Sequence, residues 1–298
     1  MSTNSLQPIF PQTLKKKTIN FIQQKKEHHE PISMLTAYDY PTALLMDQVG
    51  IDMILVGDSL GMVVLGYENT LPVTMDEMLH HCRAVARGTH QALLIGDMPF
   101  MSYQVSPADA VRNAGRFLQE GMMDAIKLEG GSERSEAVRT IVGAGIPVMG
   151  HLGLTPQSVH QMGGFRPQAK NASAAKKLLE DALILQDAGI FSLVLESIPG
   201  KLAELVTQSL DIPTIGIGAG LGCDGQVLVT HDLLGLFDRF TPKFVKRYVD
   251  LHTIMQDAFI QYRSDVEQKC FPGVEHTIEM PESEWTLLNE ILNEIDEA

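Results

Sequence analysis

The chain has 298 residues, of which 44% are hydrophobic and 20% charged, as is ordinary for a globular protein that buries a large core. Its formal charge is −14, from 37 acidic residues against 23 lysines and arginines, which argues against a nucleic-acid-binding protein because such proteins need a basic surface. The 3 cysteines are widely spaced and fit neither a disulfide framework nor a zinc site, so a reducing, cytoplasmic setting is expected.

The first segment, residues 1–30, is predicted to be an N-terminal extension that carries an exposed helix. It has no apolar core of the signal-peptide kind, and no apolar run in the chain approaches membrane-spanning length. A transit peptide is the alternative, because the segment is locally basic. The absence of arginine and the presence of Glu27 and Glu30 favour the plain helix. The basic residues are Lys15, Lys16, Lys17, Lys25 and Lys26.

Short apolar runs then alternate with segments of helical character. The runs predict eight strands, at Pro31–Asp39 (with its loop), Met53–Val56, Leu93–Asp97, Ala125–Glu129, Pro147–Gly150, Phe191–Glu196, Pro213–Gly218 and Val227–Thr230. Helices are predicted after Pro41 and at about Thr74–Gly88, Ser106–Glu120, Glu133–Gly143, Ala172–Ala188, Pro199–Gln208 and Pro242–Ser264. Thr74 and Glu77 have the spacing of a capping box at the start of one of these helices.

This alternation runs on without a linker or a change of composition. It favours a single α/β domain, a (β/α)₈ barrel of the TIM type, over the alternative of a doubly wound open sheet. The predicted organisation is the extension at residues 1–30, a catalytic barrel at residues 31–265 and an acidic C-terminal segment at residues 266–298. Residues 282–297 contain no lysine or arginine and are expected to form a solvated helical face.

Several polar residues stand where predicted strands end. In a parallel barrel the C-terminal ends of the strands meet on one face, so these residues are expected to share a site. Carboxylates on adjacent strands are ligands that suit Mg²⁺. The alternative for any single acid is that it caps the next helix or pairs with a surface lysine. The residues are Asp58, Asp97, Glu129, His151 and Glu196.

Lys127 is the unusual cation of this group, because it lies inside an apolar run. It precedes Glu129 by two positions, so both side chains project from the same face of the strand. A buried lysine needs a partner. That partner is either one of the acids or a substrate carboxylate, and the substrate is the preferred interpretation.

A glycine-rich stretch near the end of the chain matches the spacing of a dinucleotide-binding motif. Gly220, Gly222 and Gly225 carry the match, but it leads into a predicted strand rather than a helix. A tight turn of the barrel, or backbone that faces a ligand, is therefore preferred to a nucleotide site.

A set of linked motifs closely resembles the ketopantoate hydroxymethyltransferase family over about residues 31–272. The chain departs from the family at residues 166–169, where a short VQG-like run is usual, and at Leu221. The motifs, in order, are TAYD at 36–39, VGDSLGMV at 56–63, PVTMDEM at 72–78, GDMPF at 96–100, KLEGG at 127–131, GHLGLTPQ at 150–157, ESIP at 196–199 and CDGQVLV at 223–229.

The resemblance implies a (β/α)₈ enzyme of pantothenate biosynthesis that assembles as a homodecamer. Such an enzyme moves a one-carbon unit from 5,10-methylenetetrahydrofolate to 3-methyl-2-oxobutanoate, giving 2-dehydropantoate through a Mg²⁺-stabilised enolate. By the family pattern, Asp58, Asp97 and Glu129 would bind Mg²⁺, and Glu196 would accept the proton. The residues that would contact the 2-oxoacid are Asp58, Ser59, Asp97 and Lys127.

These residue types suit that chemistry. The carbon that becomes the nucleophile lies next to a ketone, so its proton needs a nearby positive charge and a positioned base before it can leave. His151 is expected to position folate or a water molecule. A related Mg²⁺-dependent barrel lyase of the phosphoenolpyruvate mutase or isocitrate lyase type is one alternative. A barrel that only binds a metabolite is the other, although a binding protein has no need of a base at Glu196.

Overall fold

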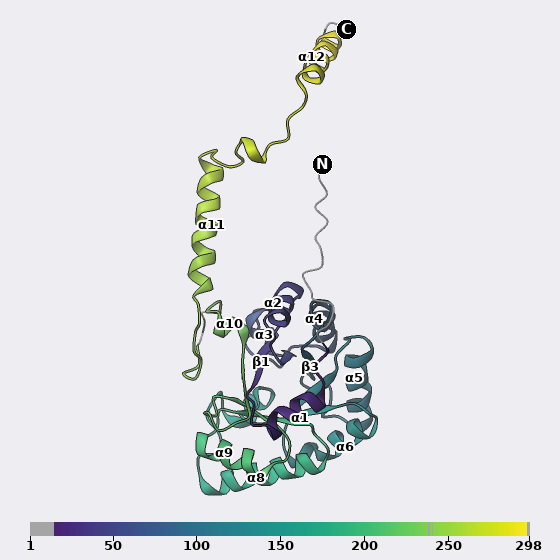
Figure 1. Cartoon of the computed structure of the whole chain (residues 1–298), viewed down its shortest axis with the longest axis vertical. Helices are drawn as coiled ribbons and strands as arrows, with labels where there is room; N and C mark the ends of the chain where they lie inside the picture. The colour runs from purple at the N-terminus through teal and green to yellow at the C-terminus, as the bar shows by residue number, and fades with distance from the viewer. Residues whose placement is uncertain (1–14, 238, 240, 297–298) are drawn as a thin grey trace. The chain divides into compact units, whose positions relative to one another are not determined.

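Eight parallel strands form a closed barrel in the order in which they occur in the chain, and β8 pairs with β1 (Figure 1). The computed structural model describes residues 15–237, 239 and 241–296. The predicted (β/α)₈ fold is confirmed, and closure excludes the open sheet. The strands are β1 (Ile32–Thr36), β2 (Met53–Val56), β3 (Leu93–Asp97), β4 (Ala125–Glu129), β5 (Val148–Gly153), β6 (Ser192–Glu196), β7 (Thr214–Ile217) and β8 (Gly225–Leu228).

Helices follow the strands, and several of them begin at a side chain that caps them. The predicted capping box is present, because Thr74 accepts from the backbone N–H of Glu77 and Glu77 accepts from that of Thr74. The helices are α1 (Ile19–Glu27), α2 (Tyr40–Gln48), α3 (Leu60–Val63), α4 (Met75–Gly88), α5 (Pro107–Gln119), α6 (Ser135–Gly143), α7 (Val159–Met162), α8 (Ala172–Asp187), α9 (Gly200–Ser209), α10 (Thr230–Leu233), α11 (Leu251–Glu267) and α12 (Glu282–Asp296). Three 3₁₀ turns accompany them: η1 (Ser132–Arg134), η2 (Pro156–Ser158) and η3 (Val274–His276).

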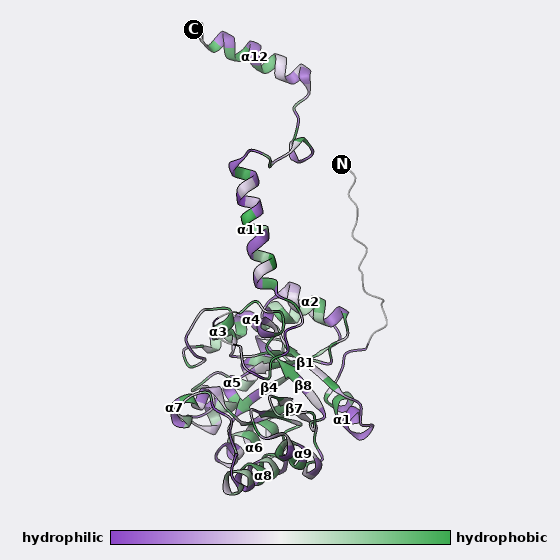
Figure 2. Ribbon diagram, turned by 90° about the vertical axis from the view of Figure 1, so that its left-hand side faces the viewer, coloured by the Kyte–Doolittle hydropathy of each residue, from purple (hydrophilic) through white to green (hydrophobic). Residues whose placement is uncertain are grey.

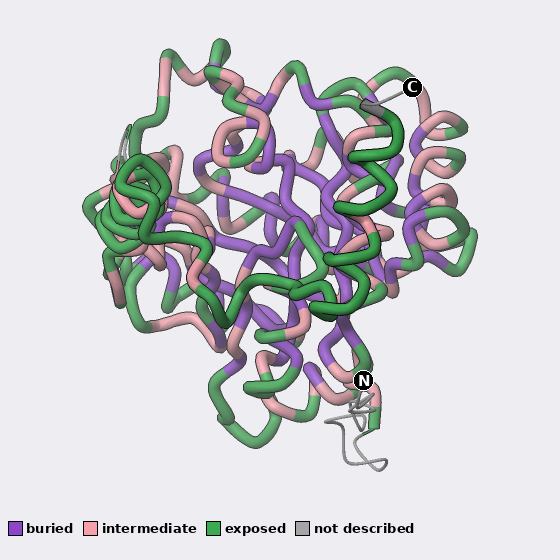
Figure 3. Tube along the Cα trace, turned by 90° about the horizontal axis from the view of Figure 1, so that it is seen from above, coloured by how far each residue is buried: buried purple, intermediate pink, exposed green. Residues whose placement is uncertain are grey.

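The two faces of most strands belong to two different apolar clusters. Along β2, Met53 and Leu55 point into the barrel, whereas Ile54 and Val56 pack under the surrounding helices. The strands are therefore largely apolar, and Figure 2 shows much of the ribbon in the barrel in green. Most residues of the strands are buried, and Figure 3 shows buried residues gathered in the inner part of the trace. A barrel interior filled in this way leaves room for polar groups only at its ends.

Helix α1 closes the N-terminal end of the barrel, so the prediction of a plain exposed helix was wrong. Ile22 is completely buried and packs in the same cluster as the inward residues of the strands. The lysines of the segment pair with aspartates that directly precede strands. Lys17 and Lys25 contact Asp52 at 3.0 and 2.7 Å, and Lys26 contacts Asp224 at 2.9 Å. Residues 1–14 of the predicted extension lie outside the described residues.

The predicted helix from Pro242 was wrong at its start, because α11 begins at Leu251. The segment before it is held by tertiary contacts in place of helical hydrogen bonds. Arg239 donates to the carbonyl oxygen of Gly66, and a Cβ atom added at Gly218, just after β7, would lie 2.6 Å from the ring of Phe244. This segment therefore lies against the C-terminal end of the barrel.

The chain divides into two compact units, residues 1–249 and 250–298, whereas the sequence predicted a boundary near residue 265. The second unit contains α11 and α12, and no residue of α11 is buried. Among the described residues, no helix has the length and apolar character needed to cross a membrane. All three cysteines are free, as expected.

Replacing Asp52 by asparagine should destabilise the barrel in a pH-dependent way. Burial opposes ionisation of Asp52, but hydrogen bonds from Lys25, Ser33 and Lys17 outweigh it and lower its pKa below the ordinary 3.8. A lowered pKa stabilises the fold above the ordinary value, and this contribution disappears as pH falls through the folded-state value. We expect Asp52→Asn to lower the free energy of unfolding by about 2 kcal/mol at pH 7.

Thermal unfolding from pH 7 down to pH 3 measures this effect. The difference in melting temperature between the wild type and Asp52→Asn should shrink below about pH 4, where the unfolded-state carboxyl group becomes protonated. Asp187→Asn, at an exposed position of α8, is the control and should change little. A difference that stays constant over this range would show that Asp52 does not act through its charge.

Candidate active site

The inward-facing rows of consecutive strands turn polar at their C-terminal ends. In β3 the row Leu93, Ile95 continues to Asp97, and in β4 the row from Ala125 continues to Lys127 and Glu129. The same alternation brings His151 after Met149 in β5 and Glu196 after Val194 in β6. The period of two that fills the barrel therefore also aims these polar side chains at its axis.

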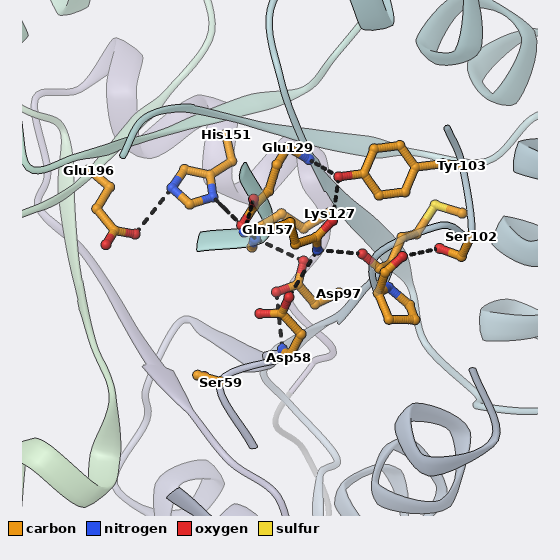
Figure 4. Close-up of polar contacts among 12 residues, drawn as sticks. Asp58, Ser59, Asp97, Ser102, Tyr103, Lys127, Glu129, His151, Gln157 and Glu196 are labelled. Carbon is orange, nitrogen blue, oxygen red and sulfur yellow. Dashed lines mark hydrogen bonds and ion pairs between the residues drawn. The ribbon is translucent and has the colours of Figure 1, made fainter. Parts of the chain in front are cut away.

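Strand register places these residues beside one another. Asp97 is the partner of Lys127 across β3 and β4, and Glu129 is the partner of His151 across β4 and β5. Asp58 follows β2, and its backbone N–H donates to Oδ2 of Asp97 at 3.2 Å. Parallel pairing of neighbouring strands has thus assembled the predicted group (Figure 4).

A pocket of about 480 Å³ opens over this end of the barrel. All the residues that the sequence predicted as site residues line it: Asp58, Ser59, Asp97, Lys127, Glu129, His151 and Glu196. Its other walls are mostly apolar and include Phe165, Pro167, Phe237 and Phe244. A pocket with apolar walls and a few convergent polar groups is the usual form of a small-molecule site.

Lys127 is buried among the acids. Its Nζ atom lies 2.8 Å from Oδ1 of Asp97 and 4.0 Å from Oε1 of Glu129. Burial disfavours the charged ammonium, but the nearby carboxylates outweigh burial and raise the pKa of Lys127. The lysine is therefore a fixed positive charge. The acids considered as partners from the sequence lie within ion-pair distance of Lys127.

Asp58 and Asp97 are held close together with little access to water. Burial raises the pKa of Asp58, and the charges of Asp97 and Glu129 raise it further. Burial also raises the pKa of Asp97, an effect that Lys127 opposes. Oδ1 of Asp97 is buried and pairs with the Lys127 ammonium group at 2.8 Å. Two desolvated acids that share a single buried lysine favour a site for an added positive charge.

Ser59 lies at the start of α3 and is held by a hydrogen bond with Tyr38, which belongs to the loop after β1. Its hydroxyl group is 2.8 Å from the hydroxyl group of Tyr38. Tyr38 is buried, which raises its pKa, so it is a neutral hydroxyl partner. The Ser59 side chain is consequently held at the pocket wall beside Asp58.

His151 connects two carboxylates. Its Nδ1 lies 3.3 Å from Oε1 of Glu129, and its Nε2 lies 3.2 Å from Oε2 of Glu196. Burial and Lys127 oppose the imidazolium, but the two carboxylates outweigh them and raise the pKa of His151 to about 9. The same interaction, together with the Lys127 charge and the N–H of Gln157, lowers the pKa of Glu129 against the effect of burial. Glu196 is the most exposed of these acids, at 15%.

Sequence reasoning missed two residues of this network. Gln157, from the turn after β5, donates from Nε2 to Oδ2 of Asp58 at 2.9 Å, and its backbone N–H donates to Oε2 of Glu129 at 3.0 Å. The hydroxyl group of Tyr103 donates to Oε1 of Gln157 at 2.7 Å and accepts from the N–H of Glu129. Gln157 belongs to the GHLGLTPQ motif, but neutral residues in loops carry no charge pattern that marks them.

The predicted magnesium ligands do not form a ready-made cluster. No group of three or more acids, histidines or cysteines stands close enough to hold a metal ion in the part of the chain that the structure describes. The reason lies at Glu129, whose oxygens already face Gln157 and His151. Of the three acids, Asp58 and Asp97 are in direct contact, because the backbone N–H of Asp58 donates to Oδ2 of Asp97.

The glycine-rich stretch does not form a nucleotide loop before a helix. Gly225 begins β8, and a Cβ atom added there would lie 2.5 Å from the carbonyl oxygen of Ile32 in β1. This close approach closes the barrel, and Gln226 donates to the carbonyl oxygen of Gly220 across the turn. The tight-turn interpretation is confirmed.

Solved structures share the fold of this chain. Phosphonopyruvate hydrolase in complex with oxalate and Mg²⁺ matches with a TM-score of 0.59 at 11% identity, covering 87% of this chain and 93% of its own. A 2,3-dimethylmalate lyase of the PEP mutase/isocitrate lyase superfamily matches with a TM-score of 0.53 at 14% identity, covering 93% and 96%. The fold and the polar pocket at the C-terminal strand ends are those of a (β/α)₈-barrel enzyme.

The particular family follows from sequence comparison. The family model of ketopantoate hydroxymethyltransferase matches residues 16–274, and the chain belongs to this family. The 3-methyl-2-oxobutanoate hydroxymethyltransferase of Syntrophobacter fumaroxidans is 62% identical over 85% of this chain and 90% of its own. That of Syntrophotalea carbinolica is 58% identical over 88% and 98%. The chain is therefore an enzyme of the hydroxymethyltransferase type, and the lyases share its fold alone.

Removing the Lys127 ammonium group should weaken binding of the 2-oxoacid more than binding of the one-carbon donor. Lys127→Met keeps the length of the side chain but leaves Asp97 and Glu129 without their cation. We expect the KM for 3-methyl-2-oxobutanoate to rise at least about tenfold, the equivalent of roughly 1.4 kcal/mol.

Steady-state kinetics with each substrate varied separately measure this effect, and thermal unfolding shows whether the variant is folded. The exposed Lys176→Met is the matched control. A defect confined to the one-carbon donor would show that Lys127 recognises a different group.

Proposed function

We propose that the pocket transfers a one-carbon unit from 5,10-methylenetetrahydrofolate to 3-methyl-2-oxobutanoate, giving 2-dehydropantoate and tetrahydrofolate. The observation that carries the proposal is the separation of charges in the pocket. A buried lysine and two close acids lie on β2, β3 and β4, and a further carboxylate, Glu196, lies two strands from β4. Such an arrangement holds a small anion at one side and a base at the other.

The 2-oxoacid is proposed to bind at Asp58, Ser59, Asp97 and Lys127. The Lys127 ammonium group would hold the substrate carboxylate or ketone oxygen as a point charge. The Ser59 hydroxyl group, fixed by Tyr38, is a hydrogen-bond donor or acceptor at the same wall. Substrate binding would thus give Lys127 a second partner besides Asp97.

Mg²⁺ is proposed as the cofactor, with Asp58, Asp97 and Glu129 as the residues that hold it. The contact between the buried residues Asp58 and Asp97 and the raised pKa values of both carboxyl groups, caused first by burial, fit a cation. Because the oxygens of Glu129 already face Gln157 and His151, we expect Glu129 to hold the ion less directly than Asp58 and Asp97 do. When bound, the ion would polarise the ketone of the 2-oxoacid and favour loss of the neighbouring proton.

Glu196 is proposed as the base. Its carboxylate would accept the proton from C3 of the 2-oxoacid, and the electron pair left on C3 would form the bond to the one-carbon unit. The methylene carbon would exchange its two bonds to folate nitrogens for one bond to C3 and one to a water oxygen. The two nitrogens would take up the C3 proton and a proton of the water as tetrahydrofolate leaves. His151, at 3.2 Å, orients the Glu196 carboxylate toward the pocket by its positive charge.

The outer part of the pocket offers the space for the folate. Phe165, Phe237 and Phe244 line it, and aromatic side chains pack well against a flat heterocycle. Arg166 and Lys243 lie on the same wall and are exposed cations that suit the glutamate carboxylates of a folate. Arg166 is one of the positions at which the chain departs from the family pattern.

A homodecamer is proposed for the assembly, as the family resemblance implies. The second unit supports an oligomer, because α11 exposes large apolar side chains that a further copy of the chain would cover. These side chains are Ile254, Phe259, Ile260 and Tyr262.

The experiment that tests the proposal is formation of 2-dehydropantoate from 3-methyl-2-oxobutanoate and 5,10-methylenetetrahydrofolate, with and without Mg²⁺. Turnover should require both the ion and the folate. Asp97→Asn should lose most of the turnover and bind Mg²⁺ more weakly in calorimetric titration, because it removes charge from an oxygen donor. Asp109→Asn, at the exposed start of α5, is the control. Equal Mg²⁺ affinity in wild type and Asp97→Asn would remove Asp97 from the metal site.

Replacing Glu196 by glutamine should separate chemistry from binding. The variant keeps the size of the side chain but cannot accept the substrate proton, and loss of a positioned base costs about 10²- to 10⁴-fold in rate. Binding of the 2-oxoacid should change little, because Lys127 and the acids near it are intact.

Exchange of the C3 hydrogen of 3-methyl-2-oxobutanoate with deuterated water, followed by NMR with Mg²⁺ but without folate, measures the proton transfer alone. The wild type should catalyse exchange and Glu196→Gln should not. Exchange at the wild-type rate in this variant would place the base elsewhere.

A further inference from the structure

Gln157 is a buried polar residue that lies outside the set predicted from sequence. It belongs to the turn η2 after β5, yet only 5% of its surface is exposed. Loop glutamines are usually exposed, and burying an amide is unfavourable unless its hydrogen bonds are made. The contacts of Gln157 are therefore the reason for its position.

Every polar group of the Gln157 side chain is used. Its Nε2 donates to Oδ2 of Asp58 and to the carbonyl oxygen of Met98, each at 2.9 Å. Its Oε1 accepts from the hydroxyl group of Tyr103 at 2.7 Å and from Gln104 at 3.3 Å. The orientation of the amide is fixed, because the carbonyl oxygen of Met98 can only accept and so must face the NH₂ group.

The backbone of Gln157 adds a contact to a second acid. Its N–H donates to Oε2 of Glu129 at 3.0 Å, while the Tyr103 hydroxyl group accepts from the N–H of Glu129 at 3.2 Å. One residue after β5 thus touches groups at the ends of β2, β3 and β4, as Figure 4 shows. No other contact between Asp58 and Glu129 is as direct among the described residues.

We propose that Gln157 is a positioning residue that sets the separation of the Asp58 and Glu129 carboxylates, and so prepares the site for a divalent cation and the 2-oxoacid. This inference rests on the proposed function. A neutral side chain suits the task, because its amide binds Asp58 without adding charge while the backbone N–H of the same residue binds Glu129. A charged lysine in its place would neutralise Asp58, and an apolar residue would leave both Asp58 and Met98 without their donor.

Gln157→Met tests the proposal, because methionine fills a similar volume but cannot donate. Outer residues that orient metal ligands typically affect metal affinity or activity by about 10- to 100-fold, and we expect Mg²⁺ affinity and kcat of Gln157→Met to fall within this range. The KM for 5,10-methylenetetrahydrofolate should stay within about twofold, since Gln157 is not among the residues proposed to contact the folate. The control is Gln119→Met at an exposed position of α5, which should match the wild type.

Calorimetric titration with Mg²⁺ alone gives the decisive readout, because a merely structural role would lower the melting temperature without changing the affinity of the folded protein. Tyr103→Phe provides a second, milder test if Gln157→Met does not fold. It removes the hydroxyl group shared by Gln157 and Glu129, and should weaken Mg²⁺ binding roughly fivefold.

Wild-type Mg²⁺ affinity in folded Gln157→Met, or in Tyr103→Phe where Gln157→Met does not fold, would overturn the inference and leave the proposed function intact. A wild-type protein that binds no Mg²⁺ would contradict the proposed metal site, and the inference would fall with it.

Discussion

The contact between the Lys127 ammonium group and the Asp97 carboxylate is the interaction on which the pocket depends. The acids around it are buried by the same barrel that fills its interior with apolar side chains. Without a cation at this depth, their mutual repulsion and the cost of desolvation would keep some of them neutral. One lysine does not balance them, and the excess of negative charge on the β2–β4 side favours a second cation. His151 partly balances the other side, between Glu129 and Glu196.

The interior of the barrel is covered in different ways at its two ends. At the N-terminal end, Ile22 closes the apolar interior, and Lys–Asp pairs surround it at the starts of strands. At the C-terminal end, the inward rows end in polar residues such as Asp97, and loops leave a pocket above them. Stability and chemistry are thus divided between the ends, as is typical of (β/α)₈ enzymes.

Prediction from the sequence succeeded for features that depend on a local pattern of residues. Apolar runs located all eight strands, and a period of two aimed Asp97, Lys127 and Glu129 at one space. It failed where contacts between distant segments decide. The lysines and glutamates of residues 15–30 led to the prediction that α1 is exposed, although Ile22 packs against the inward residues of the strands. Gln157 was missed for a similar reason, because its contacts are with Asp58 and Glu129, which lie far from it in the chain.

The closure of the barrel floor by α1 has a practical consequence for work with this enzyme. A shortened chain that starts at β1 would keep every residue of the pocket, yet it would expose the inward methionines and leucines near the start of the strands to solvent. Self-association of such a fragment would reflect the loss of α1, which covers the apolar interior, rather than an instability of the end that carries the pocket. Affinity tags are better attached ahead of residue 15 than substituted for the segment that follows it.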